Sequence, residues 1–271
     1  MEKIKNLIET AWEDRSLLAE KEIIIAIRET VNRCDRGELR CATPGDTGWQ
    51  IHEWIKKAIL LYSETQKMKP TETGIFDFHD KIPLKSAFAD KGIRVVPNAV
   101  IRHGSFISEG VTVMPSYVDM GVYIDQGSFI GAGAVVGSCA QIGKNVKISQ
   151  KTGIGGGLDL PDTAPVLIED EVFIGSGTTV TAGVQIGKEA VLGAGIVLTP
   201  STPVIDVTGT IPEESRAFIP GQAVAVAGSH PKEFPGGTHL IPSVFIIGKR
   251  IPGENPEKSL QETIKEFEIP V

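Results

Sequence analysis

The sequence predicts a mainly β protein built on a parallel β-helix, because an aliphatic residue returns at every sixth position for more than a hundred residues. The residues between these positions are rich in Gly, Asn, Asp, Lys and Pro, which favour tight turns. An amphipathic helix would need apolar returns at three and four residues, so a fixed period of six indicates a hexapeptide β-solenoid. The register runs through Val95, Ile101, Ile107, Val113, Val118, Ile124, Ile130, Val136, Ile142, Ile148, Ile154, Ile168, Ile174, Val180, Ile186, Leu192, Leu198 and Val204.

Three hexads make one triangular coil of eighteen residues, so residues eighteen apart should stack at the inter-strand spacing of about 4.8 Å. The spacing falls to five between Val113 and Val118, which predicts a local kink or a change of stacking. Between Leu158 and Ile168 an insertion with two prolines predicts a loop that leaves the coil. Such a loop either carries a binding role, as loops on rigid scaffolds commonly do, or is a passive insertion.

The segments outside the solenoid predict end caps, which a solenoid needs because its ends expose unpaired strands. Helical spacing near Ile4, Ile23 and Trp54 predicts a small helical domain over residues 1–90, followed by the β-helix over residues 91–228. Residues 229–271 form the predicted C-terminal α/β cap. This cap comprises a Pro/Gly-rich loop at His230–Pro242, a strand at Ser243–Gly248 and a helix at Lys258–Phe267.

Composition narrows the classes of partner. A formal charge of −7 without a basic cluster argues against nucleic acid, and no apolar run is long enough to span a membrane. The acidic, amphipathic N-terminus is unlike a signal peptide. Cys34, Cys41 and Cys139 are an odd number without metal-ligand spacing, which predicts a reducing, cytoplasmic setting and no metal. Cys139 has no histidine among its neighbours, so a nucleophilic role is not expected.

Several strings outside the bare hexad carry a family resemblance. The segments GIRVVPNAV, MPSYVDMGVYIDQG, GSCAQIGKN, GIGG and SVFIIGKR, with LIETAWEDR, VLGAG and VIDVTG, resemble the tetrahydrodipicolinate N-succinyltransferase family over nearly the whole chain. The resemblance implies a homotrimer of left-handed parallel β-helices with acyl-CoA in the groove between subunits. Members transfer succinyl from succinyl-CoA to the amino group of an acyclic amino-oxopimelate, in lysine and diaminopimelate synthesis.

The resemblance also implies site residues. Arg94 in GIRVV matches the arginine that binds the dicarboxylate substrate, since a guanidinium can hold a carboxylate through two parallel hydrogen bonds; the alternative is a surface ion pair. Lys249 and Arg250 suit the CoA diphosphate. Gly193 and Gly195 would allow the pantetheine arm close to backbone amides, or would only make the solenoid turn. The further substrate-binding candidates are Ser138, Gln150 and Lys151.

The sequence departs from the family pattern at one group of positions. The family string VDTWATVGS is here Ile130–Ser138, so the aspartate position is Gly131 and the tryptophan position is Gly133. The family glutamate falls at Thr179. By the eighteen-residue rule, Gly131 stacks beneath Ser149 and Gly133 beneath Lys151, so that the changes gather in one place. The interpretation is that the acceptor half of the site has changed while the scaffold has not.

Three hypotheses follow. The first is a CoA-dependent N-acyltransferase of this family with an altered acceptor, in which His103 or Asp125 replaces the missing base. Both residues are more readily explained as structural. Without such a replacement, the amine arrives deprotonated or loses its proton through water. The second is a paralogue of secondary metabolism that acylates a related amino diacid, for example in the assembly of a lysine-derived toxin. The third is a non-catalytic trimer that binds acyl-CoA or a partner protein. The donor, succinyl or acetyl, is left open.

Overall fold

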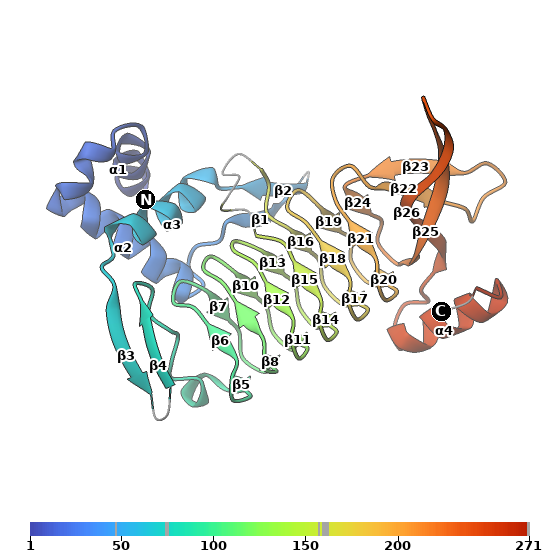
Figure 1. The fold of residues 1–271 in the computed structure, drawn as a ribbon. Coiled ribbons are helices and arrows are strands. Elements are labelled where there is room, and N and C mark those ends of the chain that lie inside the picture. The colour runs from blue at the N-terminus through green and yellow to red at the C-terminus, as the bar shows by residue number, and fades with distance from the viewer. Residues whose placement is uncertain (47, 74–75, 157, 159–162, 270–271) are drawn as a thin grey trace.

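In a computed structural model of the protein, short parallel strands wind into a three-sided prism with helices at one end and a long hairpin at the other (Figure 1). The structure describes residues 1–271 apart from 47, 74–75, 157, 159–162 and 270–271. The predicted loop between Leu158 and Ile168 falls in part on residues outside this described set. No helix among the described residues is long and apolar enough to cross a membrane.

The prism has three faces, each a parallel sheet of two-residue strands. Face 1 contains β7 (Phe106–Ile107), β10 (Tyr123–Ile124), β13 (Gln141–Ile142), β16 (Leu167–Ile168), β19 (Gln185–Ile186) and β24 (Phe218–Ile219). Face 2 begins with β5 (Arg94–Val95), β8 (Thr112–Val113), β11 (Phe129–Ile130), β14 (Lys147–Ile148), β17 (Phe173–Ile174) and β20 (Val191–Leu192). Face 3 contains β6 (Val100–Ile101), β9 (Tyr117–Val118), β12 (Val135–Val136), β15 (Gly153–Ile154), β18 (Thr179–Val180) and β21 (Val197–Leu198).

The predicted register is confirmed from Val95 to Leu198, since every position in it is the second residue of a strand. These residues point inward and form one continuous aliphatic core. The five-residue step after Val113 makes the repeats that contain it seventeen residues long, so Ile107 stacks on Ile124. The following coil has the predicted eighteen residues, as Ile124 on Ile142 shows.

The register ends one position earlier than predicted. Val204 is buried, but β22 (Pro203–Asp206) leaves the coil and pairs with β23 (Glu213–Arg216) and β26 (Gly237–Lys249). Ile219 of β24 takes the place above Ile186 instead. The physical reason is the insertion between β21 and β24, which carries the chain out to form the extra strands before it returns for a last turn.

Three edges join the faces, and we name them by what covers them. The helix-covered edge runs from face 3 to face 1 through the turns at 102–105, 119–122 and 137–140. The roofed edge runs from face 1 to face 2 through the turns at 125–128, 143–146, 169–172 and 187–190. The bare edge runs from face 2 to face 3 through the turns at 131–134, 149–152, 175–178 and 193–196.

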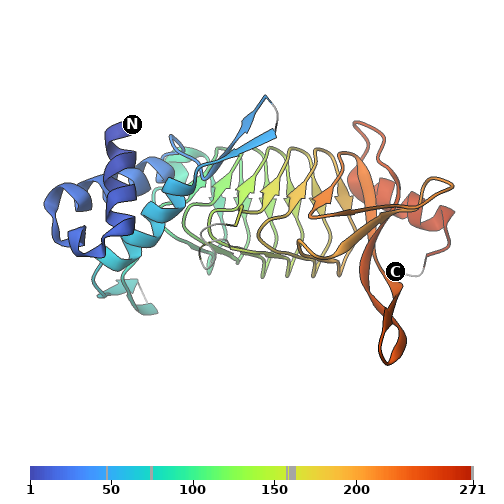
Figure 2. The ribbon, with the colours of Figure 1, turned by 90° about the horizontal axis from the view of Figure 1, so that it is seen from above.

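The N-terminal helices close one end of the prism (Figure 2). They are α1 (Glu2–Glu13), α2 (Lys21–Asp35) and α3 (Glu53–Thr65), with a 3₁₀ turn η1 (Arg15–Ala19) and, before the first coil, η2 (Ala89–Lys91). Their apolar faces meet the helix-covered edge, where Ile59 shares one buried cluster with Met120 and Cys139. Two hairpins accompany them: β1 (Ala42–Gly45) with β2 (Gly48–Ile51), and β3 (Lys69–Thr73) with β4 (Phe76–Asp80).

At the C-terminal end the predicted loop at His230–Pro242 is wrong. Those residues belong to a long antiparallel hairpin of β25 (Ala223–Phe234) and β26, which projects from the prism (Figure 1). The strand predicted at Ser243–Gly248 is confirmed within β26. The domain boundaries at 90 and 228 stay predictions, although β25 runs through the second one.

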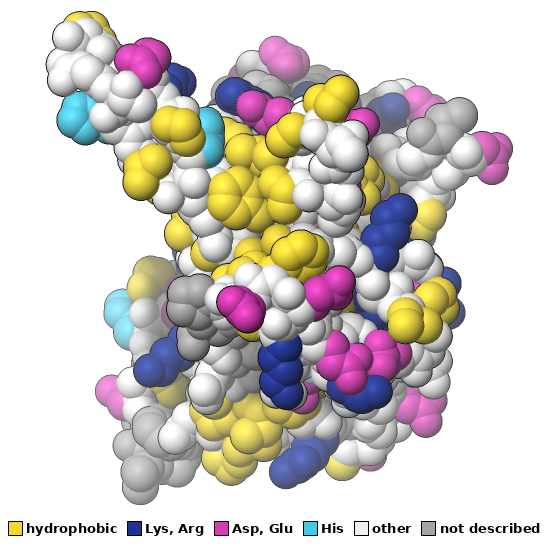
Figure 3. Space-filling model, turned by 90° about the vertical axis from the view of Figure 1, so that its right-hand side faces the viewer, with side chains coloured by type: hydrophobic (Ala, Val, Ile, Leu, Met, Phe, Trp, Pro, Cys, Tyr) yellow, Lys and Arg dark blue, Asp and Glu magenta, His cyan; other side chains and the backbone are white. Residues whose placement is uncertain are grey.

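The terminal helix α4 (Pro256–Glu266) begins after Asn255, whose side chain accepts hydrogen bonds from the N–H groups of Glu257 and Lys258. Its apolar residues Leu260 and Ile264 pack on outward-facing residues of face 2. Hydrophobic side chains also gather on the surface of this end of the molecule (Figure 3). Strongly exposed examples in its segments are Ile211, Leu240 and Ile251.

Candidate active site

The bare edge is built from turns that stack directly on one another. The N–H of Lys151 donates to the carbonyl of Ala132 over 2.9 Å, and the N–H of Gly177 donates to the carbonyl of Gln150 over 3.1 Å. One coil further, the N–H of Gly195 donates to the carbonyl of Ser176 over 3.0 Å. This ladder of backbone bonds holds a straight, rigid edge along the prism.

Two glycines leave this edge without side-chain cover. Gly177 and Gly195 have φ values of +69° and +71°, and a Cβ at either would meet nothing within 4 Å. Positive φ favours glycine here, and the open space means that a ligand could approach the backbone closely. Gly193 is different, because a Cβ there would lie 3.4 Å from the carbonyl oxygen of Ala225. The backbone at Gly195 is therefore accessible, whereas Gly193 serves the packing of the turn.

A smooth apolar strip lies beside the bare edge on face 3. Val135 and Val197 point outward with exposed fractions of 46% and 52%, and Thr179 between them is also exposed. Gly153 pairs with both Val135 and Thr179 and leaves a dent between them. Analysis of the sequence missed this strip, although its signal is visible: each member directly precedes an inward aliphatic position.

The stacking predicted for the altered family positions is confirmed. The N–H of Gly131 donates to the carbonyl of Ile148 over 2.8 Å, and Gly133 lies next to the side chain of Lys151. A Cβ at Gly131 would lie only 2.6 Å from the backbone N of Gln150. A carboxylate therefore cannot be placed at position 131 without displacing the next coil. This backbone accommodates glycine at position 131.

Two exposed cations stand over this region. Lys151 lies in the turn at 149–152 with φ of +58°, and Arg94 points outward from the first strand of face 2. Among the described residues neither side chain has a carboxylate within ion-pair distance. Three inter-strand steps separate β5 from β14, which is roughly 14 Å along the prism. Both cations are thus available to ligand carboxylates, and the surface ion pair considered for Arg94 is not formed in the described chain.

His103 lies in a different environment, in a polar cluster under α2. Its Nδ1 lies 3.3 Å from Oδ1 of Asp35, and its Nε2 lies 3.0 Å from Oδ1 of Asn32. Lys85 reaches the same Asp35 oxygen at 2.7 Å and donates to the carbonyl of Ser105. Burial alone would raise the pKa of the Asp35 carboxyl, but hydrogen bonds from His103 and Lys85 and the charge of Lys85 hold that pKa well below its usual range. His103 therefore fastens α2 to the first coil.

Asp125 and Ser138 also lie away from the bare edge. Asp125 occupies the turn at 125–128 on the roofed edge. Ser138 lies on the helix-covered edge, where its buried Oγ accepts a hydrogen bond from the N–H of Leu158 over 3.3 Å. The structure does not bring either residue together with Gly131 or Thr179. For Ser138 the physical reason is a shift of seven residues from Gly131, which moves it around the coil to the next edge.

Lys249 and Arg250 are placed on the far side of face 2 from Gly193 and Gly195. Lys249 pairs with Ala223, which lies at the end of the strand next to the roofed edge. Arg250 is buried, and its guanidinium donates to the carbonyls of Glu171 and Glu254 at 2.8–3.0 Å. These bonds give Arg250 the role of a clamp on the segment before α4. Lys249 is exposed and remains a candidate for a phosphate contact.

Metal and thiol chemistry find no support in the part of the chain that the structure describes. It contains no group of three His, Cys, Asp or Glu side chains that could hold a metal ion. Cys139 is fully buried, and its hydrogen bond with Cys41 together with burial raises the pKa of its thiol well above the usual value. A nucleophilic cysteine needs a lowered pKa and access, so Cys139 has a packing role.

Two protein-family models match parts of this chain. Residues 165–200 match a family model described as the hexapeptide repeat of succinyl-transferase, which, with the stacked two-residue strands, defines the chain as a hexapeptide-repeat acyltransferase. Residues 3–64 match the model described as tetrahydrodipicolinate N-succinyltransferase N-terminal.

Curated relatives match over nearly full length. The 2,3,4,5-tetrahydropyridine-2,6-dicarboxylate N-succinyltransferase of Ralstonia pickettii (strain 12J) is 44% identical, over 92% of this chain and 93% of its own. The proteins of the same name from Albidiferax ferrireducens and Variovorax paradoxus are 40% and 36% identical, each over 98% of this chain and 99% of the relative. The chain belongs to the tetrahydrodipicolinate N-succinyltransferase family.

Proposed function

We propose that this chain transfers the succinyl group of succinyl-CoA to the amino group of an amino dicarboxylate of the amino-oxopimelate type, in lysine and diaminopimelate synthesis. The observation that supports this most is full-length similarity to the relatives just described, combined with an intact bare edge beside an apolar strip. The proposal includes an acceptor site that differs from the family pattern at Gly131, Gly133 and Thr179.

The bare edge suits the donor. The pantetheine arm of CoA alternates amide groups with short apolar segments. The backbone at Gly177 and Gly195 is accessible to the amides, and Val135 and Val197 lie alongside for the apolar parts. One wall of a groove is present in a single chain. We expect the second wall to come from a neighbouring copy in a homotrimer, which would also cover the exposed valines.

The two free cations suit the acceptor. Arg94 and Lys151 are long, exposed side chains separated by roughly 14 Å along the prism, with Gly131 and Gly133 between them. A linear seven-carbon diacid can lie between them with one carboxylate near each end. This arrangement would place the middle of the acceptor, with its amine, over the turn that contains Gly131 and Gly133.

Removal of the amine proton is the demanding step. An alkyl amine with a pKa near 10 is about one part in a thousand neutral at pH 7, which corresponds to roughly 4 kcal/mol. The four turns of the bare edge contain no Asp, Glu or His. The proton would therefore leave to water, and the protein would contribute by aligning amine and thioester. Without a base of the protein, the rate should rise about tenfold per pH unit from pH 7 to 9.

A thiol-release assay tests the proposal. Succinyl-CoA and acetyl-CoA are each offered with tetrahydrodipicolinate, 2-aminopimelate and shorter amino diacids, and the acylated products are identified by mass spectrometry. We expect succinyl-CoA and a seven-carbon acceptor to be preferred. Absence of thiol release with every pair would contradict the proposal and favour a non-catalytic trimer.

Variants connect the activity to the site. Arg94→Gln and Lys151→Gln should each raise the KM for the acceptor about tenfold, which corresponds to about 1.4 kcal/mol, and leave the KM for the donor unchanged. Lys91→Gln, which removes an exposed cation close to Arg94 in sequence, is the matched control. Equal KM changes for donor and acceptor would show that the acceptor does not lie between the two cations.

A further inference from the structure

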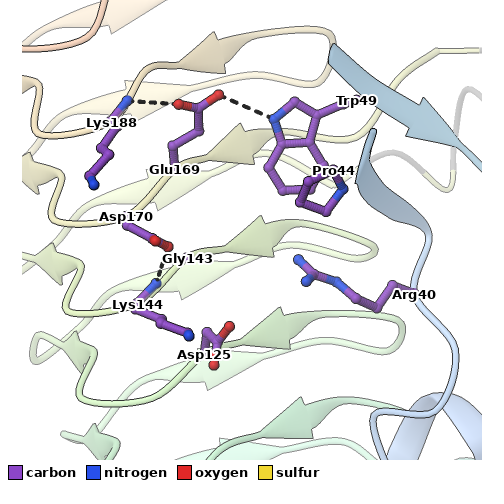
Figure 4. Close-up of a pocket in the computed structure, with 9 residues that line it drawn as sticks. All are labelled: Arg40, Pro44, Trp49, Asp125, Gly143, Lys144, Glu169, Asp170 and Lys188. Atoms are coloured by element: carbon purple, nitrogen blue, oxygen red, sulfur yellow. Dashed lines mark hydrogen bonds between the residues drawn. The ribbon is translucent and has the colours of Figure 1, made fainter. Parts of the chain in front are cut away.

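A cavity of about 410 Å³ opens on the roofed edge (Figure 4). This edge is not the one that carries the candidate active site. Its roof is the β1–β2 hairpin with Pro44 and Trp49. Its floor is a series of solenoid turns that present Asp125, Lys144 and Lys188 from different coils. Six charged side chains and the apolar Pro44 and Trp49 thus meet in one concave space, so a ligand there would be recognised mainly through charge.

The roof is fixed to the floor. The indole N–H of Trp49 donates to Oε1 of Glu169 over 3.3 Å, and the same carboxylate accepts from the side chain of Gln185 and from the N–H of Lys188. Pro44 and Trp49 are paired across the hairpin, so the two side chains form one apolar surface. The cavity is therefore part of the folded chain and not a gap under a loose loop.

The side chain of Arg40 points into the cavity, where the two terminal nitrogens of its guanidinium can bind a ligand. Its guanidinium lies 3.7 Å from the ring centre of Tyr123, and its Nε donates to Gln141 over 3.1 Å. Within the described residues, its two terminal nitrogens make no hydrogen bond, and no carboxylate lies within ion-pair distance of them. A half-buried guanidinium that is held in place by a ring and an amide, but lacks an anion, is prepared for an external carboxylate.

The opposite charge is supplied by Asp125. Its carboxylate accepts one hydrogen bond, from the N–H of Gln126 in its own turn, and forms no ion pair with the described residues. Asp170 also accepts one backbone hydrogen bond, at its Oδ1 from the N–H of Lys144 over 2.7 Å, but this bond joins two coils, whereas the bond of Asp125 stays within its own turn. The cavity therefore offers an unpaired cation and an unpaired anion, within the described chain, under a shared apolar roof.

We propose that this cavity binds a zwitterionic α-amino acid. Arg40 receives the carboxylate, Asp125 receives the ammonium group, and the aliphatic side chain lies beneath Trp49 and Pro44. The three cations and three carboxylates of the lining balance, which favours a neutral zwitterion over a dicarboxylate. The site is separate from the transferase groove, and an occupant would tie the N-terminal hairpin to the coils.

Binding of L-norleucine tests the proposal on the full-length protein without any CoA. Norleucine carries all three recognised parts, whereas hexanoate lacks the ammonium group and pentylamine lacks the carboxylate. We expect norleucine to change Trp49 fluorescence and to raise the unfolding temperature, since a ligand of the folded state stabilises it. Hexanoate and pentylamine should bind at least tenfold more weakly. Trp49→Phe should remove most of the fluorescence change.

Two variants test whether Asp125 and Arg40 bind the charged groups of norleucine. Asp125→Asn keeps the shape of the side chain, and Arg40→Lys keeps its charge without the fork; each should weaken norleucine binding about tenfold or more. Arg28→Gln and Asp90→Asn, which remove exposed charges elsewhere, are the controls and should bind as the native chain does.

Three results would overturn the proposal: no norleucine binding at millimolar concentration, equal binding of hexanoate or pentylamine, or a crystal structure in which a second copy fills the cavity. None of these results would contradict the transferase proposal, because thiol release from succinyl-CoA is measured separately. Conversely, loss of transferase activity in an Arg94 variant would leave norleucine binding unchanged.

Discussion

The helix-covered edge and the bare edge use the same turn and differ in what surrounds it. Gly121 on the first and Gly177 on the second have φ values of +71° and +69°. A Cβ at Gly121 would lie 2.6 Å from Ile59 and 3.0 Å from the sulfur of Cys139, whereas a Cβ at Gly177 would meet nothing within 4 Å. The hexad therefore determines the backbone alike on every edge. Whether an edge becomes an attachment surface or a groove depends on segments outside the repeat.

The helix-covered edge contributes mainly to stability, and the bare edge mainly to the proposed function. The helix-covered edge gathers Met120 and Cys139 into a core with the N-terminal helices and carries a buried ion pair. The bare edge and its apolar strip leave Gly177, Gly195, Val135 and Val197 in solvent. Substitutions on the first edge should act on unfolding, and substitutions of outward-facing side chains on the second should act on catalysis.

Asp35→Ala should have the largest effect, because it leaves Lys85 charged and unpaired at 2% side-chain exposure. Removing one partner of a buried pair costs about 3–5 kcal/mol, and we expect about 4 kcal/mol here. Equilibrium urea unfolding measures this change. Arg36→Ala, which removes only exposed ion pairs on the neighbouring residue, should change the free energy of unfolding by less than about 1 kcal/mol.

The same carboxyl predicts a pH dependence. Since its pKa is lowered in the folded protein, the unfolded chain takes up the proton first as the pH falls. The stabilisation is therefore present above about pH 4, the ordinary pKa of aspartate, and is lost progressively below it. The difference in unfolding free energy between the native chain and Asp35→Ala should shrink on acidification. A difference that stays constant from pH 7 to 3 would show that the charge of Asp35 is not responsible.

Gly131→Asp should come second, at about 3 kcal/mol. Its Cβ would press on the backbone of Ser149 and Gln150, which cannot move aside without disturbing the next coil. Gly131→Ala introduces the same Cβ without the charge and should cost nearly as much. Gly153→Ala is the control, since its Cβ would meet Thr179 at an ordinary 3.8 Å. A well-folded Gly131→Asp protein would show that the edge is softer than its backbone bonds indicate.

Gly121→Ala and Gly177→Ala test the comparison of the edges directly. Both replace a glycine of positive φ, which costs about 1 kcal/mol for the backbone alone. Gly121→Ala should cost about 2 kcal/mol more, because its methyl group must also displace Ile59 or Cys139. Unfolding of the two variants in parallel measures the difference. Equal losses would mean that the helical end does not pack tightly against its edge.

Stacking along the prism could be predicted from the sequence because it depends only on the number of residues per coil. That count correctly placed Gly131 beneath Ser149, and the stacking change considered for the five-residue step after Val113 is seen as a seventeen-residue repeat. The residue count failed where the chain leaves the repeat. Val204 continues the six-residue spacing, yet it belongs to a strand outside the coil.

The features that could not be predicted lie in segments without a repeating sequence pattern. Within the β25–β26 hairpin, the Pro/Gly-rich composition of His230–Pro242 predicts a loop, although Pro235–Gly236 at its tip is a turn signal between two strands. Arg250 resembles a phosphate ligand in sequence and is a buried clamp in space. The roofed cavity joins Arg40 of the N-terminal segment to Lys188 of a late coil, a juxtaposition that no local pattern contains.

Thr179→Glu should have the smallest effect on stability, because Thr179 lies exposed beside the dent at Gly153 with room for a longer side chain. A surface change of this kind alters the free energy of unfolding by about 0.5 kcal/mol or less. The change should appear in catalysis, since a carboxylate here adds the proton acceptor that the bare edge lacks. We expect kcat to rise about tenfold or more at pH 7, which is less than the roughly 10²–10⁴-fold of an optimally positioned general base.

The pH profile distinguishes a base from a change of shape. If the carboxylate introduced by Thr179→Glu acts as a base, the steep rise of rate between pH 7 and 9 should flatten, because deprotonation no longer depends on free hydroxide or neutral amine alone. Thr179→Gln has the same size without the charge and should keep the native slope. If Thr179→Glu and Thr179→Gln share one rate and one profile, the amine does not react beside face 3, and the acceptor must be placed elsewhere on the edge.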